Sequence, residues 1–178
     1  MFKTAFITIL GLPNAGKSTF LNAALGEELV ITNPKAQTTR HRIKGILNEG
    51  NYQLIFSDTP GIIKESAYKL QDAMMSAVTD SLEDADIVLL MLDGQYPRVE
   101  DFEAYRDKID VPLVVAMNKT DLVTDPEQLQ QDIDKVKGYF KTEHVYAVSA
   151  KEKFNVDSIL SKLVELAPEH PPFYDTES

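Results

Sequence analysis

The amino-acid sequence predicts an α/β fold in which helices cover both faces of a mostly parallel sheet. Short apolar runs alternate with longer segments of helical periodicity, an arrangement that is typical of consecutive βαβ units. The apolar runs lack the polar alternation of a one-sided sheet, which indicates strands buried on both faces. With 178 residues, 43% of them apolar, the chain has the length of one domain and enough apolar material for a core.

Six segments are expected to be strands. The first ends where Gly11 begins a loop. The second and third flank the turn Glu49-Gly50, a spacing that predicts a β-hairpin and therefore one antiparallel strand. The expected strands are residues 2–10, 41–48, 51–57, 87–92, 111–117 and 145–148.

Five segments have helical character. The first directly follows a glycine-bearing loop and can end at Gly26. The fourth has a proline in its first turn, and Asn155 or its neighbours can cap the fifth. The expected helices are residues 17–25, 68–82, 99–109, 126–140 and 155–166.

Composition and charge exclude several classes of protein. No apolar run reaches the roughly 18–20 residues that a membrane-spanning helix needs, and the first residues do not have the pattern of a signal peptide. The absence of cysteine excludes disulfides, thiolate metal sites and a cysteine nucleophile. A formal charge of −10 repels polyanions at long range. We therefore expect one soluble domain, most simply cytoplasmic.

Residues 11–18 read GLPNAGKS, which fits the phosphate-loop pattern G-x-x-x-x-G-K-[ST]. The backbone amides of such a loop surround a phosphate, and the helix that begins there adds its unpaired N–H groups and positive dipole. Lys17 is placed to reach the β- and γ-phosphates, and Ser18 to bind Mg²⁺. The alternative is a chance match in a turn, but the expected strand before it and helix after it favour the phosphate loop.

A second loop, Asp58-Thr59-Pro60-Gly61, follows the third expected strand. Taken alone it is an ordinary turn. After a phosphate loop, however, Asp58 can hold a water molecule of Mg²⁺, and Gly61 can offer a backbone amide to a γ-phosphate. In that order the turn becomes a sensor of the terminal phosphate.

Two further loops follow the last two expected strands. In Asn118-Lys119-Thr120-Asp121, the Asp121 carboxylate can accept hydrogen bonds from the N1–H and the exocyclic amine of guanine, a pair that adenine lacks. The alternative is a turn with an N-capping aspartate. In Ser149-Ala150-Lys151, a backbone amide can meet guanine O6, although this tripeptide carries little weight alone.

Together these motifs resemble the Era-like family of translation-factor-class P-loop GTPases. The resemblance rests on GLPNAGKST, KAQTTRHRIKGI, SDTPGI, NKTD and VSAK, and it covers nearly all of residues 3–167. It implies a three-layer fold with a six-stranded, mostly parallel sheet, one antiparallel strand and about five helices. It also implies a GTPase domain over residues 1–167 that hydrolyses GTP to GDP and switches between the two states, in a ribosome-assembly protein.

The resemblance assigns roles by position. Lys17, Thr39 and Gly61 would act in hydrolysis, with Thr38 as the alternative to Thr39. Mg²⁺ would be held by Ser18, Thr39 and, through water, Asp58, and Asn14 would help to bind K⁺. The residues that would bind GTP or GDP are Gly11, Asn14, Ala15, Gly16, Lys17, Ser18, Thr19, Asp58, Gly61, Asn118, Lys119, Asp121, Ser149, Ala150 and Lys151.

One departure from Ras-like enzymes bears on turnover. Ile62 follows Gly61 where those enzymes have the glutamine that orients the attacking water. Because an isoleucine side chain cannot polarise water, we expect slow intrinsic hydrolysis in which Mg²⁺, Lys17 and backbone amides stabilise the developing charge. The alternatives are a GTP-dependent recruitment switch with negligible hydrolysis and a related tRNA-modification or ribosome-assembly GTPase. An ATPase is disfavoured by residues 118–121.

The basic residues Lys35, Arg40, His41, Arg42 and Lys44 form an island in an acidic sequence. A solvated surface is the favoured interpretation, and a contact with RNA or another partner is the alternative. The resemblance implies that the full-length protein binds the 16S rRNA of the small ribosomal subunit, mainly through a KH domain beyond a linker at residues 168–178. We expect this chain itself to be monomeric and to bind RNA weakly. A peripheral place at the inner membrane is the alternative to the cytoplasm for the full-length protein.

Overall fold

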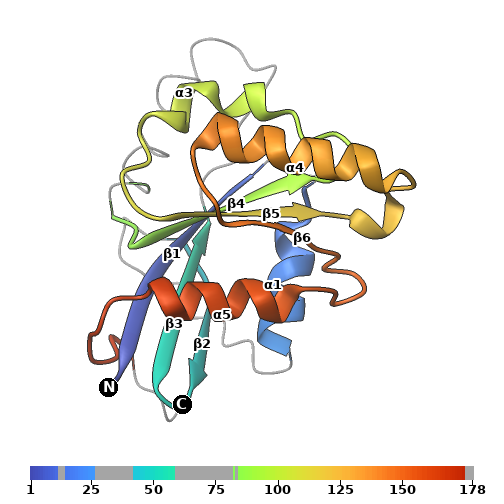
Figure 1. Ribbon diagram of the computed structural model, residues 1–178. Coiled ribbons are helices and arrows are strands. Elements are labelled where there is room, and N and C mark those ends of the chain that lie inside the picture. The colour runs from blue at the N-terminus through green and yellow to red at the C-terminus, as the bar shows by residue number, and fades with distance from the viewer. Residues whose placement is uncertain (12–14, 27–41, 59–81, 83, 175–178) are drawn as a thin grey trace.

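The computed structural model describes residues 1–11, 15–26, 42–58, 82 and 84–174. A sheet in the order β2-β3-β1-β4-β5-β6 forms its middle layer (Figure 1). Neighbouring strands are parallel except β2, which is antiparallel to β3, and this confirms the expected α/β sheet. The strands are β1 (Lys3–Gly11), β2 (Arg42–Glu49), β3 (Tyr52–Asp58), β4 (Ile87–Asp93), β5 (Leu113–Asn118) and β6 (Val145–Ala147).

Helices lie on both faces of the sheet. The helices α1 (Lys17–Leu25) and α5 (Val156–Leu166) cover one face, and α3 (Glu103–Arg106) and α4 (Pro126–Phe140) cover the other (Figure 1). The helix expected at residues 68–82 lies outside the described residues apart from Leu82, which is helical. Among the described residues, every helix is too short or too polar to span a bilayer.

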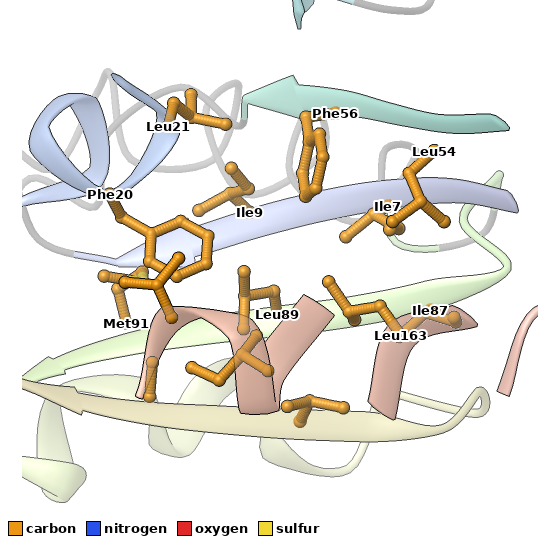
Figure 2. Packing of buried hydrophobic residues seen from close by; sticks show 14 of the residues in the cluster. Ile7, Ile9, Phe20, Leu21, Leu54, Phe56, Ile87, Leu89, Met91 and Leu163 are labelled. Carbon is orange, nitrogen blue, oxygen red and sulfur yellow. The ribbon is translucent and has the colours of Figure 1, made fainter. Parts of the chain in front are cut away.

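Alternate side chains of β4 enter two different cores, which explains why this strand is apolar throughout. One core lies against α1 and α5, and Figure 2 shows fully buried Phe20 pointing into it from α1. Burial of one such side chain contributes roughly 1.5–3 kcal/mol. The residues of β4 in this core are Ile87, Leu89 and Met91. The residues of β4 in the core against α4 are Val88, Leu90 and Leu92.

The helix expected over residues 99–109 is shorter and tighter in the structure. A 3₁₀ helix, η4 (Val99–Phe102), runs into the single turn of α3, which ends at Arg106. The buried side chains of this segment are Val99, Phe102 and Tyr105. Val99 and Phe102 are three residues apart within η4, a spacing that places both side chains on one side of a 3₁₀ helix.

The N-termini of α4 and α5 are built differently. Asp125 caps α4, because its carboxylate accepts hydrogen bonds from the backbone N–H groups of Glu127 and Gln128, at 3.0 and 3.3 Å. Asn155 stands at the corresponding position of α5, but its side chain does not cap a backbone N–H. Its amide donates instead to the carbonyl of Ala147 and its oxygen accepts from the hydroxyl of Ser158. Asn155 therefore ties α5 to β6.

Residues 168–174, here called the C-terminal strap, run back along the sheet. The carbonyl of Pro168 accepts a hydrogen bond from the backbone N–H of Thr4 at 3.1 Å. Fully buried Gln53 of β3 accepts from the backbone N–H groups of Phe173 and Tyr174 and donates to the carbonyl of Tyr174. The first residues of the expected linker therefore pack on the domain.

Candidate functional site

Three of the four predicted loops meet, in their described residues, at the carboxyl ends of the parallel strands. Gly11 ends β1 and Asn118 ends β5, and ligand sites of open α/β sheets lie outside such strand ends. A cavity of about 250 Å³ opens there. Its lining comes from three of the loops singled out above and consists of Gly16, Thr19, Asn118, Lys119, Asp121, Leu122 and Lys151.

The structure explains both glycines of the phosphate loop. Gly16 has a φ of 90°, and a Cβ atom there would overlap with the side-chain amide of Asn118. A Cβ atom on Gly11 would lie 2.9 Å from the carbonyl oxygen of Met91 in β4. It would also lie 3.6 Å from Cδ of Lys17, so the lysine stem runs back over the end of β1. Both ends of the loop are therefore closely packed, Gly11 against Met91 and Gly16 against Asn118.

The helix α1 begins directly at this loop. The carbonyl of Gly16 accepts a hydrogen bond from the backbone N–H of Phe20 at 2.9 Å, the first bond of the helix. Ser18 and Thr19 are exposed in this first turn. A helix N-terminus at the mouth of a cavity, with lysine and hydroxyl side chains beside it, suits an anionic ligand such as a phosphate.

Asn118 joins two loops that lie far apart in the sequence. Its side chain is buried, donates to the carbonyl of Ala15 at 2.9 Å, and accepts from the backbone N–H of Ala150 at 2.9 Å. One amide group thus satisfies a carbonyl of the phosphate loop and an N–H of the loop after β6. It fixes the two loops on either side of the cavity.

Asp121 is held from the same side. The hydroxyl of Ser149, which is buried, donates to Oδ1 of Asp121 at 2.9 Å. Asp121 itself is exposed and lines the cavity. It stands in the 3₁₀ helix η5 (Thr120–Leu122), and Thr120 donates through its hydroxyl to the carbonyl of Val148 at 2.8 Å. The carboxylate is therefore oriented before any ligand arrives.

Several predicted site residues lie outside the described part of the chain, namely Asn14, Thr38, Thr39 and Gly61. Asp58 is described only in its backbone, which ends β3 opposite Ile9 of β1. Within the described residues there is no cluster of three or more carboxylate or histidine side chains that could hold a metal ion. Ser18 is the described residue that fits Mg²⁺, since its exposed hydroxyl is an oxygen ligand beside the phosphate loop.

The sequence analysis did not single out Leu122, Asp93 and Gln95. Leu122 lines the cavity although its side chain is half exposed, and no sequence motif marks it. Asp93 ends β4, and Gln95 follows two residues later. The rule that polar residues at the carboxyl end of a buried parallel strand face the site would have identified Asp93.

Comparisons with known proteins agree with this geometry. Residues 6–119 match the family model described as 50S ribosome-binding GTPase. The GTPase Era of Thermoanaerobacter sp. (strain X514) is 38% identical over 175 residues, which are 97% of this chain and 57% of that protein. This chain thus spans little more than half the length of this curated relative.

Two solved structures have similar folds. A variant of Aquifex aeolicus Era bound to GDP and AlF4⁻ is 33% identical, with a TM-score of 0.80 over 99% of this chain and 61% of that one. Era in complex with MgGDPNP and nucleotides 1506–1542 of 16S ribosomal RNA is 33% identical, with a TM-score of 0.81 over 100% and 61%. Sequence, fold and loop geometry agree, and the chain belongs to the 50S ribosome-binding GTPase family as a GTPase domain of the Era type.

Proposed function

We propose that this chain binds GTP and GDP at the carboxyl edge of the sheet and hydrolyses GTP to GDP and inorganic phosphate. The observation that carries the proposal is the Asn118 side chain, which joins Ala15 of the phosphate loop to Ala150 across one cavity. A side-chain amide that holds these two loops together is explained if the loops bind opposite ends of one ligand. A nucleotide has such ends, a base and a chain of phosphates.

The base end of the ligand would meet Asp121. Its Oδ1 accepts from Ser149, and the remaining acceptor positions of the carboxylate are directed to the guanine N1–H and exocyclic amine. The backbone N–H of Ala150 is already bonded to Asn118, so the guanine O6 contact falls to another amide of residues 149–151. Adenine has neither this pair of donors nor an O6 atom, so GTP is preferred over ATP.

The phosphate end would meet the amides of the loop, the start of α1 and the ammonium of Lys17. Bound Mg²⁺ supplies charge stabilisation at the phosphates and would be held by Ser18, Thr39 and a water on Asp58. Because Ile62 cannot orient a water molecule, turnover is slow.

Asn14 would help to bind K⁺, so hydrolysis should be faster in KCl than in NaCl at equal ionic strength, and Asn14→Ala should remove that difference.

Binding of a fluorescent GDP to the purified chain tests this function, with GTP, ATP and inorganic triphosphate as competitors. We expect displacement by GTP and little displacement by ATP. Equal competition by ATP would overturn the guanine assignment. Phosphate release measured over hours then separates a slow GTPase from a recruitment switch, for which no turnover above the background of a Lys17→Ala variant is expected.

For the longer protein we propose a role in ribosome assembly through 16S rRNA. The related Era structure supports the contact with 16S rRNA, since it holds nucleotides 1506–1542 of that RNA, and the family description, which names the 50S ribosome, supports only a role at the ribosome. Most of the RNA contact would come from outside this chain, which would itself be a monomer that binds RNA weakly. The cytoplasm is the proposed location.

A further inference from the structure

The turn after β4 is attached to the loop after β5 at three successive residues. The backbone N–H of Gly94 donates to the carbonyl of Asn118 at 2.6 Å, and the side-chain amide of Gln95 donates to the carbonyl of Leu122 at 3.4 Å. Directly before Gly94 in the chain, Oδ2 of Asp93 lies 3.7 Å from Nζ of Lys119. The loop that carries Asp121 is therefore braced from its side by residues 93–95.

This close approach requires its glycine. A Cβ atom on Gly94 would lie 2.6 Å from the carbonyl oxygen of Asn118, so any other residue would push the two loops apart. The carboxylate of Asp93 is also fixed in place, because its Oδ1 accepts from the backbone N–H of Gln95 at 2.8 Å. With a side chain only 18% exposed, Asp93 meets Lys119 in a partly dehydrated place where the charges are incompletely screened.

The conformation of Lys119 bears directly on the cavity. Its backbone has a φ of 64°, its side chain is one-third exposed, and it lines the cavity beside Asp121. A lysine stem has four rotatable bonds, and a side chain that is ordered only when a ligand arrives weakens the binding of that ligand. A contact that orders the stem beforehand therefore raises affinity.

We infer that Asp93 is a positioning residue for nucleotide binding: its carboxylate holds the Lys119 ammonium and lays the lysine stem along the wall of the cavity. Asp93 is not among the residues that line the cavity, so it acts through Lys119 and not on the ligand. The inference rests on the proposed function, because it assumes that the base of a guanine nucleotide occupies this cavity.

Asp93→Asn tests the inference with little change of shape. The asparagine oxygen can still accept from the N–H of Gln95, so the turn is kept while the charge opposite Lys119 is lost. We expect the dissociation constant of fluorescent GDP to rise roughly three- to tenfold, the range expected when one of the contacts that order a long side chain in advance is lost. The hydrolysis rate at saturating GTP should stay unchanged, because the phosphate end of the site is not touched.

A second variant separates positioning from general damage to the fold. Lys119→Met removes the ammonium and keeps an apolar stem, so it should show a loss of similar size, and adding Asp93→Asn to it should cause no further loss. Asp107→Asn is the matched control: Asp107 is also 3.7 Å from a cation, Arg106, but neither residue lines this cavity, and nucleotide affinity should not change.

Three results would overturn the inference. The first is GDP affinity at the parental level in Asp93→Asn or in Lys119→Met. The second is a loss of GDP affinity from Asp93→Asn that is equally large with and without the Lys119 ammonium. The third is a fall of the hydrolysis rate at saturating GTP together with the GDP affinity. The melting temperatures of the variants are measured first, and all titrations are run below them. A parent chain that binds no GDP would instead reject the proposed function itself.

Discussion

Gly16 carries two separate constraints at one residue. Its φ of 90° disfavours any side chain, and the Asn118 amide occupies the place of a Cβ atom. Gly26 has a φ of 58° but has nothing within 4 Å of a built Cβ atom. The two glycines therefore differ in sterics, and they also differ in ψ: Gly16 is left-handed with a ψ of 30°, whereas Gly26 has a ψ of −141°, in a region that side chains rarely adopt.

Gly16→Ala should lower the free energy of unfolding and abolish GDP binding, whereas Gly26→Ala should destabilise the fold and leave GDP binding intact. At position 16 the left-handed backbone contributes about 1–2 kcal/mol and the Asn118 side chain must also move. At position 26 the cost, roughly 1–3 kcal/mol, comes from the backbone conformation alone. Urea unfolding and GDP titration of both variants measure this. GDP binding intact in Gly16→Ala would show that the contact with Asn118 does not matter.

Asp121→Asn should exchange guanine for xanthine specificity. The carboxylate loses its two charge-assisted acceptor positions for guanine, which costs on the order of 3 kcal/mol of GTP binding. An asparagine amide can instead donate to the extra oxygen of xanthosine triphosphate, while its oxygen still accepts from Ser149. Competition titrations with both nucleotides provide the measurement, and Asp125→Asn, which keeps the cap of α4, is the control. GTP binding at the parental level would remove Asp121 from the base site.

At the scale of elements, the C-terminal strap depends on one side chain of β3. Gln53 is fully buried and its amide serves both Phe173 and Tyr174. The strap also places the ring of Phe173 4.8 Å from that of Phe6 in β1. The strap therefore contacts two strands, β1 and β3, and is attached to them through defined side chains.

Gln53→Leu should leave partly buried backbone groups of the strap without partners and lower the free energy of unfolding by roughly 1–3 kcal/mol. Amide hydrogen exchange at residues 173 and 174 should accelerate, whereas GDP affinity should not change, because Gln53 stands five residues before the end of β3. Gln128→Leu, at an exposed position of α4, is the control and should alter stability by less than about 0.5 kcal/mol. Unchanged exchange would mean that the strap is held by its other contacts.

At the scale of the whole molecule, charge opposes binding of nucleic acid. The formal charge is −10, and the basic island of residues 35–44 stands alone against it. We expect this chain to bind a labelled 3′-terminal fragment of 16S rRNA with a dissociation constant above the micromolar range at about 150 mM salt. Sub-micromolar binding that disappears when Arg40 and Arg42 are neutralised would instead identify the island as an RNA site.

The local features of this protein follow from short stretches of its sequence. The bounds expected for β1 and β4 agree with the structure within one residue, and those expected for α4 agree exactly. They agree because an apolar run, a proline in the first turn of a helix and a glycine in a loop each influence the conformation of only a few neighbouring residues. The phosphate-loop motif likewise depends on residues that are adjacent in the chain. The hairpin of β2 and β3 followed from the turn between them.

Contacts between side chains that are far apart in the sequence depend on the three-dimensional fold. The contact of Asn118 with Ala15 joins residues 103 positions apart, and that of Gln53 with Tyr174 joins residues 121 positions apart. No local preference encodes such pairs, because they form when strands stack in a given order and loops meet at one edge. The helix expected at residues 99–109 is instead the 3₁₀ helix η4 followed by the single turn of α3, because helix propensity alone does not distinguish these two hydrogen-bond patterns.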